Sequence, residues 1–155
     1  MIKKFIFFII IFNFFTNCGF TPIYSNNTNL NFSISSIKFE GDKVINNFLK
    51  TNLSNFRNNK YDRKFTIEVK TTYNKNILSK DKSAKTTNYE LTSQTLFQIK
   101  SNGKTIKNLT VNEKKIMDNI NDDLEEQKNE RTHKQNFASS ISNKLLSELS
   151  MLNDN

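Results

Sequence analysis

Two stretches in the middle of the chain alternate apolar and polar side chains with a period of two residues. In residues 63–74 the more apolar face carries Phe65, Ile67, Val69, Thr71 and Tyr73. In residues 88–101 the same pattern selects Tyr89, Leu91, Ser93, Thr95, Phe97 and Ile99. Because successive side chains of a β-strand point to opposite sides, each stretch predicts a strand that is buried on one face.

The dipeptide Asn102-Gly103 follows the second stretch directly. Both central residues of a type I′ turn need positive φ, which Asn and Gly tolerate, so this pair predicts a tight hairpin. Residues 104–111 should then return antiparallel to the second strand. Between the two alternating strands, residues 74–88 are predicted to form a basic loop.

One helix is predicted before these strands in the sequence and another after them. Residues 32–41 predict a first strand with a bulge or mixed faces, and Asp42 is a suitable N-cap for a helix that reaches Phe56. From Asp122 to Leu152 a second helix carries an apolar stripe only in its second half, which alone is expected to pack on the core. The predicted fold class is α+β, with two helices on one face of a four-stranded, mainly antiparallel or mixed sheet in the order β-α-β-β-β-α.

The composition predicts one small, basic domain with a thin core. The chain has 155 residues, 23 Lys and Arg against 15 Asp and Glu, and a net charge of +8. Without the first 17 residues it is roughly 30% apolar, against about 45–50% for an ordinary soluble domain. The charge favours anionic partners, namely nucleic acid, anionic lipid or a phosphorylated glycolipid. The thin core favours a partner that supplies further burial.

Catalytic and metal-binding patterns are missing from the sequence. One Cys and one His cannot supply a zinc site or an internal disulfide, and three Gly leave no phosphate-binding loop. His133 lies among charged residues and is interpreted as a solvated helix residue. The acidic run Asp122, Asp123, Glu125 and Glu126 is interpreted as helix N-terminal charge. We therefore expect that the protein is not an enzyme and that it has neither a catalytic residue nor a metal site.

The N-terminal segment has the outline of a secretory signal. Lys3 and Lys4 precede an apolar run from Phe5 to Phe15, which at eleven positions is short of the ~20 residues that a membrane-spanning helix needs. The run ends almost at Cys18, an arrangement that resembles the lipobox of bacterial lipoproteins, although Phe15, Thr16 and Asn17 depart from its usual residues. The alternative is an incidental buried thiol after an uncleaved anchor.

The lipobox resemblance implies that Cys18 receives a diacylglyceryl group and becomes the first residue of the mature chain. This covalent lipid is the only attached group expected, with no other cofactor, and it would bind the protein to a membrane. The expected organisation is a lipoprotein signal peptide at 1–17, a lipidated N-terminus and tether at 18–31, and a single domain at 32–155. A secretion signal also argues against nucleic acid as a partner.

Five basic residues are candidates for contact with an anionic ligand. Lys80, Lys82 and Lys85 lie in the basic loop, where they could present ammonium groups to phosphates. Arg57 and Arg63 are two of only three arginines, so they are less readily explained by a lysine-rich composition. The alternative for the lysines is a plain solvated loop.

The residues as a set resemble a known family. The stretch Cys18, Gly19, Phe20, Pro22 and Tyr24 matches the Cys-Gly-Phe-x-Pro-Leu-Tyr opening of the LptE family of lipopolysaccharide-assembly lipoproteins in its alphaproteobacterial branch, with Ile23 in place of Leu. The runs "YELTSQTLFQI" and "FASSISNKLLSELS" are also similar to that branch.

This resemblance implies a small LptE-like α/β domain at the periplasmic side of the outer membrane. It implies that the domain plugs the large β-barrel translocon LptD, assists its assembly and supports lipopolysaccharide transport and insertion at the cell surface. Lipopolysaccharide is then a ligand, and LptD is the protein partner. The alternative function is an envelope lipoprotein that binds another protein or peptidoglycan, with no role in lipopolysaccharide export.

Overall fold

A computed structural model describes residues 31–152, apart from 59. The expected signal peptide at 1–17, Cys18 and nearly all of the tether at 18–31 lie outside the described residues. The described elements are β1 (Ser33–Gly41), α2 (Lys43–Asn52), the 3-10 turn η3 (Ser54–Phe56), β2 (Lys64–Lys80), β3 (Thr86–Ser101), β4 (Lys104–Asp118) and α3 (Asp123–Met151).

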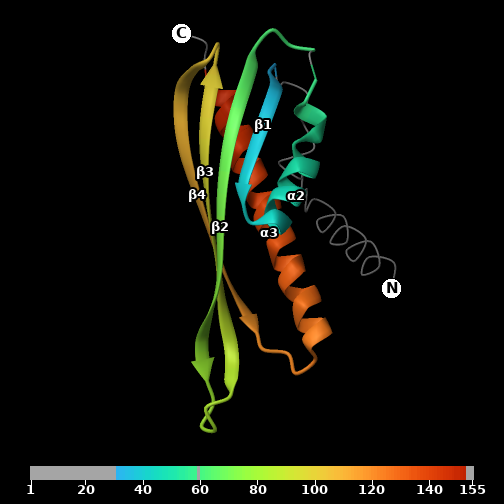
Figure 1. The fold of residues 1–155 in the computed structure, drawn as a ribbon, viewed down its shortest axis with the longest axis vertical. Coiled ribbons are helices and arrows are strands. Elements are labelled where there is room, and N and C mark those ends of the chain that lie inside the picture. Colours follow the sequence, from blue (N-terminus) through green and yellow to red (C-terminus); the bar gives the residue numbers. More distant parts are fainter. Residues whose placement is uncertain (1–30, 59, 153–155) are drawn as a thin grey trace, which may run out of the picture. The chain divides into compact units, whose positions relative to one another are not determined.

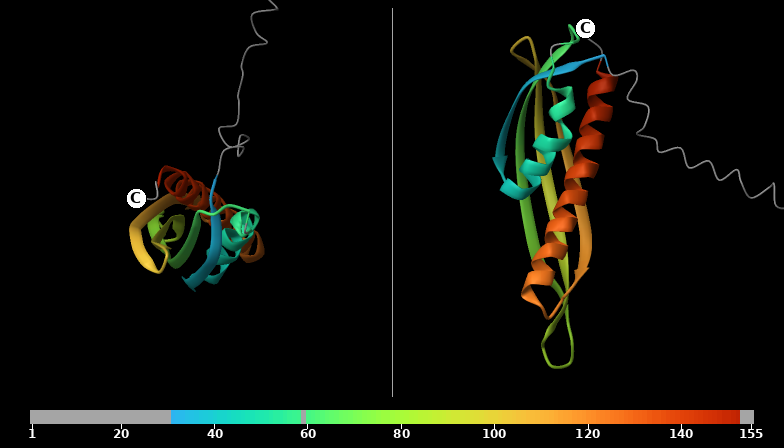
Figure 2. Two further views of the ribbon diagram at one scale, coloured as in Figure 1. Left: turned by 90° about the horizontal axis from the view of Figure 1, so that it is seen from above. Right: turned by 90° about the vertical axis from the view of Figure 1, so that its right-hand side faces the viewer.

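The domain has two layers, a four-stranded sheet and a pair of helices that cover one of its faces (Figures 1 and 2). The strands follow one another in the order β1-β2-β3-β4. β1 runs parallel to β2, while β2, β3 and β4 pair antiparallel. A parallel neighbour requires a crossover, which α2 provides between β1 and β2. The predicted fold class and element order are confirmed.

The two alternating stretches form the centre of the sheet, with the faces that the pattern predicts. Ile67 pairs with Ile99 and Val69 with Phe97, and all four side chains are buried under the helices. Thr71 pairs with Thr95, and their hydroxyls lie 3.3 Å apart within the core. These two threonines thus partner each other, whereas the buried Ser93 hydroxyl has no hydrogen-bond partner among the described residues.

Asn102 and Gly103 adopt φ of 49° and 78°, so the predicted hairpin turn with two left-handed residues is confirmed. The strands are longer than the pattern indicated. β2 continues to Lys80 and β3 begins at Thr86, so the predicted loop at 74–88 shrinks to residues 81–85, and β4 continues past 111 to Asp118. Backbone pairing extends through polar positions such as Asn76 and Glu90, because ladder hydrogen bonds do not require apolar side chains.

The ends of the first two elements are set by local chemistry. The expected bulge in β1 is present as a register shift between Ile34 and Ser36. The Asp42 carboxylate accepts a hydrogen bond from the Ile45 amide at 2.8 Å, which confirms the predicted N-cap. The prediction that this helix reaches Phe56 was wrong, because α2 ends at Asn52 and a separate 3-10 turn follows.

In α3 the predicted apolar stripe is confirmed, since Phe137, Ile141, Leu145 and Leu149 are all buried. Asp122 caps the helix by accepting from the amides of Leu124 and Glu125 at 2.9 Å, and the rest of the acidic run lies in the first turn, as its interpretation as helix N-terminal charge predicted. Within the part of the chain that the structure describes, no helix combines the length and the apolar character needed to cross a membrane.

Candidate functional site

The hairpin between β2 and β3 extends beyond the start of α3 and forms one end of the domain, here called the hairpin end (Figure 1). It consists of residues 77–87 together with residues 116–124, which include the end of β4, the β4–α3 connection and the start of α3. The turn is held by Asp81, whose carboxylate accepts from the amides of Ser83 and Lys85 at 2.8 and 2.9 Å. A rigid turn of this kind holds the flanking lysines at a defined position.

Lys80, Lys82 and Lys85 are all exposed at this tip. Among the described residues, Lys80 and Lys82 have no ion-pair partner, and the Lys85 ammonium group donates to the Asn121 side chain at 2.7 Å. This contact, and the Asn119 amide bonded to the Thr87 carbonyl at 2.8 Å, join the hairpin to the β4–α3 connection. The three predicted lysines are therefore brought together.

Large apolar side chains are exposed around the same lysines. Four of the seven exposed large hydrophobic residues in the described ranges belong to the hairpin end, and these are Ile77, Leu78, Ile116 and Leu124, each between 46% and 77% exposed. Exposed apolar side chains concentrated at one end of a domain mark that end as a candidate interaction surface. Exposed aliphatic groups beside free ammonium groups are typical of segments that lie at a lipid interface.

Acidic side chains at this end are mostly occupied by structural contacts. Asp81 closes the turn, Asp118 accepts from the Asn88 side chain at 2.6 Å, and Asp122 caps α3. Asp123 and Glu125 are exposed in the first turn of the helix, where its dipole favours negative charge. The ammonium groups of Lys80 and Lys82 thus remain available to an anionic ligand.

Arg57 and Arg63 lie at the other end of β2, about 50 Å from the tip for a strand of this length. Arg57 is exposed after η3. The Arg63 guanidinium donates to the Asn31 side chain at 3.1 Å and to the Leu149 carbonyl at 3.2 Å, so it joins β2 to the end of α3. These two residues do not share a site with the three lysines.

A charged network fills the space between the sheet and the first half of α3. Lys75 on β2 contacts Glu126 at 2.7 Å and Glu130 at 3.1 Å. Lys134 contacts Asp42 at 3.1 Å and Glu130 at 3.5 Å. The expectation that only the second half of α3 packs on the core is confirmed, because all buried residues of the helix lie from Phe137 onward. The first half is attached by these partly buried ion pairs instead.

Aromatic rings complete this network, here called the α3 network. The Lys75 ammonium lies 4.3 Å from the centre of the Tyr89 ring, and that of Lys134 lies 3.8 Å from the centre of the Tyr73 ring. Burial raises the pKa of the Tyr73 hydroxyl, and the negative charge of Glu130 raises it further. Burial alone would raise the pKa of Glu130, but the hydrogen bond from Lys75 and the positive charges of Lys75 and Lys134 hold it below its ordinary value.

The residues of the α3 network follow the spacing of the buried faces in the sequence. Lys75 continues the buried phase of β2 after Thr71 and Tyr73, so its side chain points toward the helices. Glu126, Glu130 and Lys134 extend the stripe of α3 toward its N-terminus at four-residue spacing. His133 is half-buried beside the network, where burial and the positive charge of Lys115 lower its pKa.

Known structures provide a comparison for the fold. No family model matches the sequence, and no curated protein is similar to it by sequence. The rare lipoprotein B of Shewanella oneidensis has a TM-score of 0.56 at 10% identity, over 74% of this chain and 93% of that one. Lipoprotein B of Nitrosomonas europaea has a TM-score of 0.56 at 13% identity, over 78% and 86%.

A minor lipoprotein of Acinetobacter baumannii is also similar, with a TM-score of 0.52 at 16% identity, over 74% of this chain and 92% of that one. These alignments cover nearly the whole of each compared structure. At such low identity they establish the arrangement of the backbone, and they agree with the fold that the resemblance to the LptE family implied. The described domain therefore has the fold shared by these rare and minor lipoproteins.

Proposed function

We propose that this protein is an envelope lipoprotein that supports the transport of lipopolysaccharide to the cell surface. In this proposal Cys18 carries the lipid that anchors the chain to the periplasmic side of the outer membrane, and the β-barrel LptD is its partner. The shared fold with lipoproteins supports the anchor, as does the match of residues 18–24 to the opening of the LptE family.

The observation that carries the glycolipid role is the composition of the hairpin end. Free ammonium groups of Lys80 and Lys82 can pair with phosphates, while Ile77, Leu78 and Ile116 can contact acyl chains. Lipid A presents phosphates and acyl chains in one molecule. Among the five basic residues that the sequence suggested, the three at the tip fit this role, whereas the Arg63 guanidinium is already used in structural contacts.

Replacing Lys80, Lys82 and Lys85 together by Gln should weaken binding of purified lipopolysaccharide roughly 100-fold, at about 1 kcal/mol for each lysine near an anionic lipid surface. The matched control replaces Lys43, Lys50 and Lys64, which are exposed and lie away from the hairpin end. It removes the same total charge. Affinity measured by fluorescence or calorimetry should fall only in the first variant. An equal fall in both variants would show that net charge alone accounts for the loss of affinity.

Purification of the tagged full chain from membranes tests the anchor and the partner together. Intact mass should show a diacylglyceryl group on a chain that begins at Cys18, and a barrel protein of several hundred residues should co-purify. Cys18→Ser should abolish the lipid and release the protein from the membrane fraction. A lipidated chain that recovers peptidoglycan or a different protein, and no barrel, would favour the alternative envelope function.

A further inference from the structure

The face of the sheet that points away from the helices presents amides and hydroxyls in cross-strand register. Here it is called the open face. One row across β2, β3 and β4 consists of Thr72, Gln94 and Asn112, and the next consists of Asn74, Thr92 and Lys114. In the first row the Gln94 side-chain amide donates to the Asn112 side-chain oxygen Oδ1 at 3.2 Å. Directly opposed residues of this kind form a continuous polar surface.

The charges on the open face largely cancel in pairs. Lys100 contacts Glu68 at 2.7 Å, Lys70 lies 3.7 Å from Glu40, and Lys114 pairs with Glu90. Lys38 on β1 has no ion-pair partner within the described ranges. The face therefore combines a high density of hydrogen-bonding groups with little net charge, unlike the hairpin end.

Much of this hydrogen-bonding capacity is unused within the described part of the chain. The side chains of Asn74, Thr92, Gln98, Asn108 and Thr110 make no hydrogen bond to another described residue. An amide offers two donors and an acceptor, and a hydroxyl can act as either. This supply of both donors and acceptors suits a ligand rich in hydroxyl groups.

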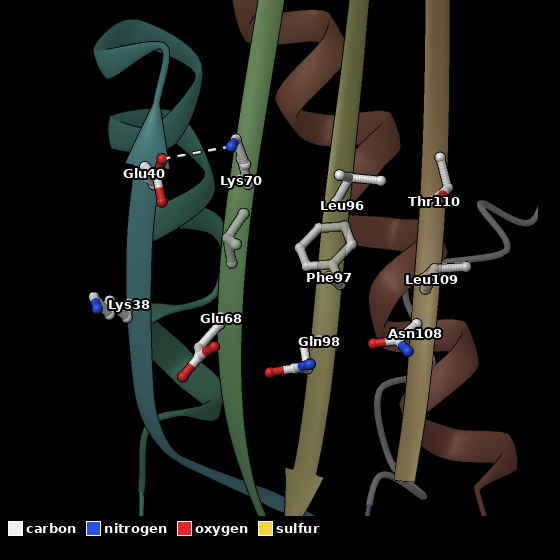
Figure 3. A pocket seen from close by; sticks show the side chains of 11 residues that line it. Lys38, Glu40, Glu68, Lys70, Leu96, Phe97, Gln98, Asn108, Leu109 and Thr110 are labelled. Atoms are coloured by element: carbon white, nitrogen blue, oxygen red, sulfur yellow. Dashed lines mark ion pairs between the residues drawn. The ribbon is translucent and has the colours of Figure 1, made fainter. Parts of the chain in front are cut away.

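Two hollows of about 440 Å³ each lie over adjacent rows of the open face. The lower hollow, nearer the hairpin end, is lined by Thr72, Asn74, Thr92 and Gln94, among others. The upper hollow, farther from the hairpin end, is seen in Figure 3, where Gln98 and Asn108 lie side by side and Leu96 lies level with Thr110. Leu96 is an exposed apolar residue in the lining of the upper hollow, and it offers a surface for the C–H groups of a ring.

We propose that the open face binds the saccharide part of the same anionic glycolipid whose phosphates and acyl chains meet the hairpin end. This inference rests on the proposed function. A sugar chain presents hydroxyls along its edges and C–H groups on its ring faces, which match the amide rows and Leu96. A purely anionic ligand would require more unpaired cations than this face provides, and an added peptide strand would pair with a sheet edge rather than a face.

The two surfaces are continuous along the sheet. β2 leads from Thr72 in the lower hollow to Lys80 at the tip, a distance of about 25 Å. Leu78 and Ile116 lie between them toward the tip. A single amphiphilic molecule laid along β2 and β3 would then place its sugars over the polar rows and its lipid portion at the hairpin end.

The test uses the full-length lipoprotein in detergent micelles and the acyl-free oligosaccharide released from lipopolysaccharide. The variant Asn74→Ala, Thr92→Val, Gln98→Ala removes three side chains that make no internal hydrogen bond, so the fold should be retained. We expect at least tenfold weaker oligosaccharide binding by calorimetry. The matched control Asn47→Ala, Gln127→Ala, Asn136→Ala removes three exposed helix amides and should bind as the parent does.

Independent of any variant, the side-chain amide resonances of Gln94 and Asn112 should shift when the oligosaccharide is added. Replacing Lys80, Lys82 and Lys85 should weaken binding of whole lipopolysaccharide and leave oligosaccharide binding unchanged. If whole lipopolysaccharide binds but the free oligosaccharide does not, the inference is overturned and the proposed function stands. Preferential binding of peptidoglycan glycan fragments would overturn the assignment of the ligand, and binding of neither molecule would contradict the proposed function itself.

Discussion

Replacing Gly41 by alanine should lower the free energy of unfolding by roughly 3 kcal/mol or more, because two penalties act at one position. Gly41 has φ of +98°, which side-chain-bearing residues rarely adopt. An added Cβ would also lie 1.9 Å from the Thr71 carbonyl oxygen. That oxygen belongs to the central strand β2 and accepts a hydrogen bond from the Asp42 amide at 2.9 Å.

Gly103→Ala is the matched control for this change. Gly103 also has positive φ, at +78°, but nothing lies within 4 Å of the position of an added Cβ. It should therefore cost only about 1 kcal/mol from backbone strain. Urea unfolding followed by circular dichroism measures both variants. Equal losses would show that the contact with β2 is relieved by a small shift, and that the β1–α2 junction is less rigid than the structure indicates.

Replacing Lys134 by methionine should destabilise the domain by about 2 kcal/mol. Methionine keeps much of the side-chain length but removes the charge that pairs with Asp42 and Glu130. The side chains of Lys134, Asp42 and Glu130 are only 13%, 16% and 21% exposed. Once the ammonium group is removed, water therefore solvates the two carboxylates poorly. Loss of the cation over the Tyr73 ring adds to the effect.

Lys70→Met provides the comparison, because the Lys70–Glu40 pair is 3.7 Å long and its side chains are 61% and 70% exposed. An exposed pair of this kind contributes less than about 1 kcal/mol. Thermal and urea unfolding of both variants should separate them clearly. A loss for Lys134→Met as small as that for Lys70→Met would mean that the α3 network does not hold the first half of the helix to the sheet.

The proposed lipopolysaccharide-binding role depends on where the hairpin end is held. The α3 network connects Lys75 on β2 to two turns of α3, and Asp42 brings the start of α2 into the same group. These contacts position the lower half of the sheet, from which the hairpin with Lys80 and Lys82 projects. We therefore expect stability and ligand binding to respond to different residues, with the network affecting the first and the tip lysines the second.

The candidate site was partly visible in the sequence. Lys80, Lys82 and Lys85 were suggested by their density in one segment, and the structure places them at one tip. Ile77 and Leu78 lie in the same segment, but a loop was predicted there, so their place on the exposed end of a long strand could not be anticipated. Ile116 and Leu124 join them only because β4 pairs with β3 and returns to this end.

Local patterns by themselves determined the order of the elements, the buried faces of β2 and β3, the turn at Asn102-Gly103, the cap at Asp42 and the acidic start of α3. Each depends on side-chain periodicity or on hydrogen bonds between neighbours in the chain. The tertiary structure alone decided the length of the strands, the ion pairs between β2 and α3, the separation of Arg63 from the tip lysines and the hollows of the open face. These features depend on which residues far apart in the sequence become neighbours in space. Backbone pairing, and the burial of a charge against its partner, leave only a weak trace in any single stretch of sequence.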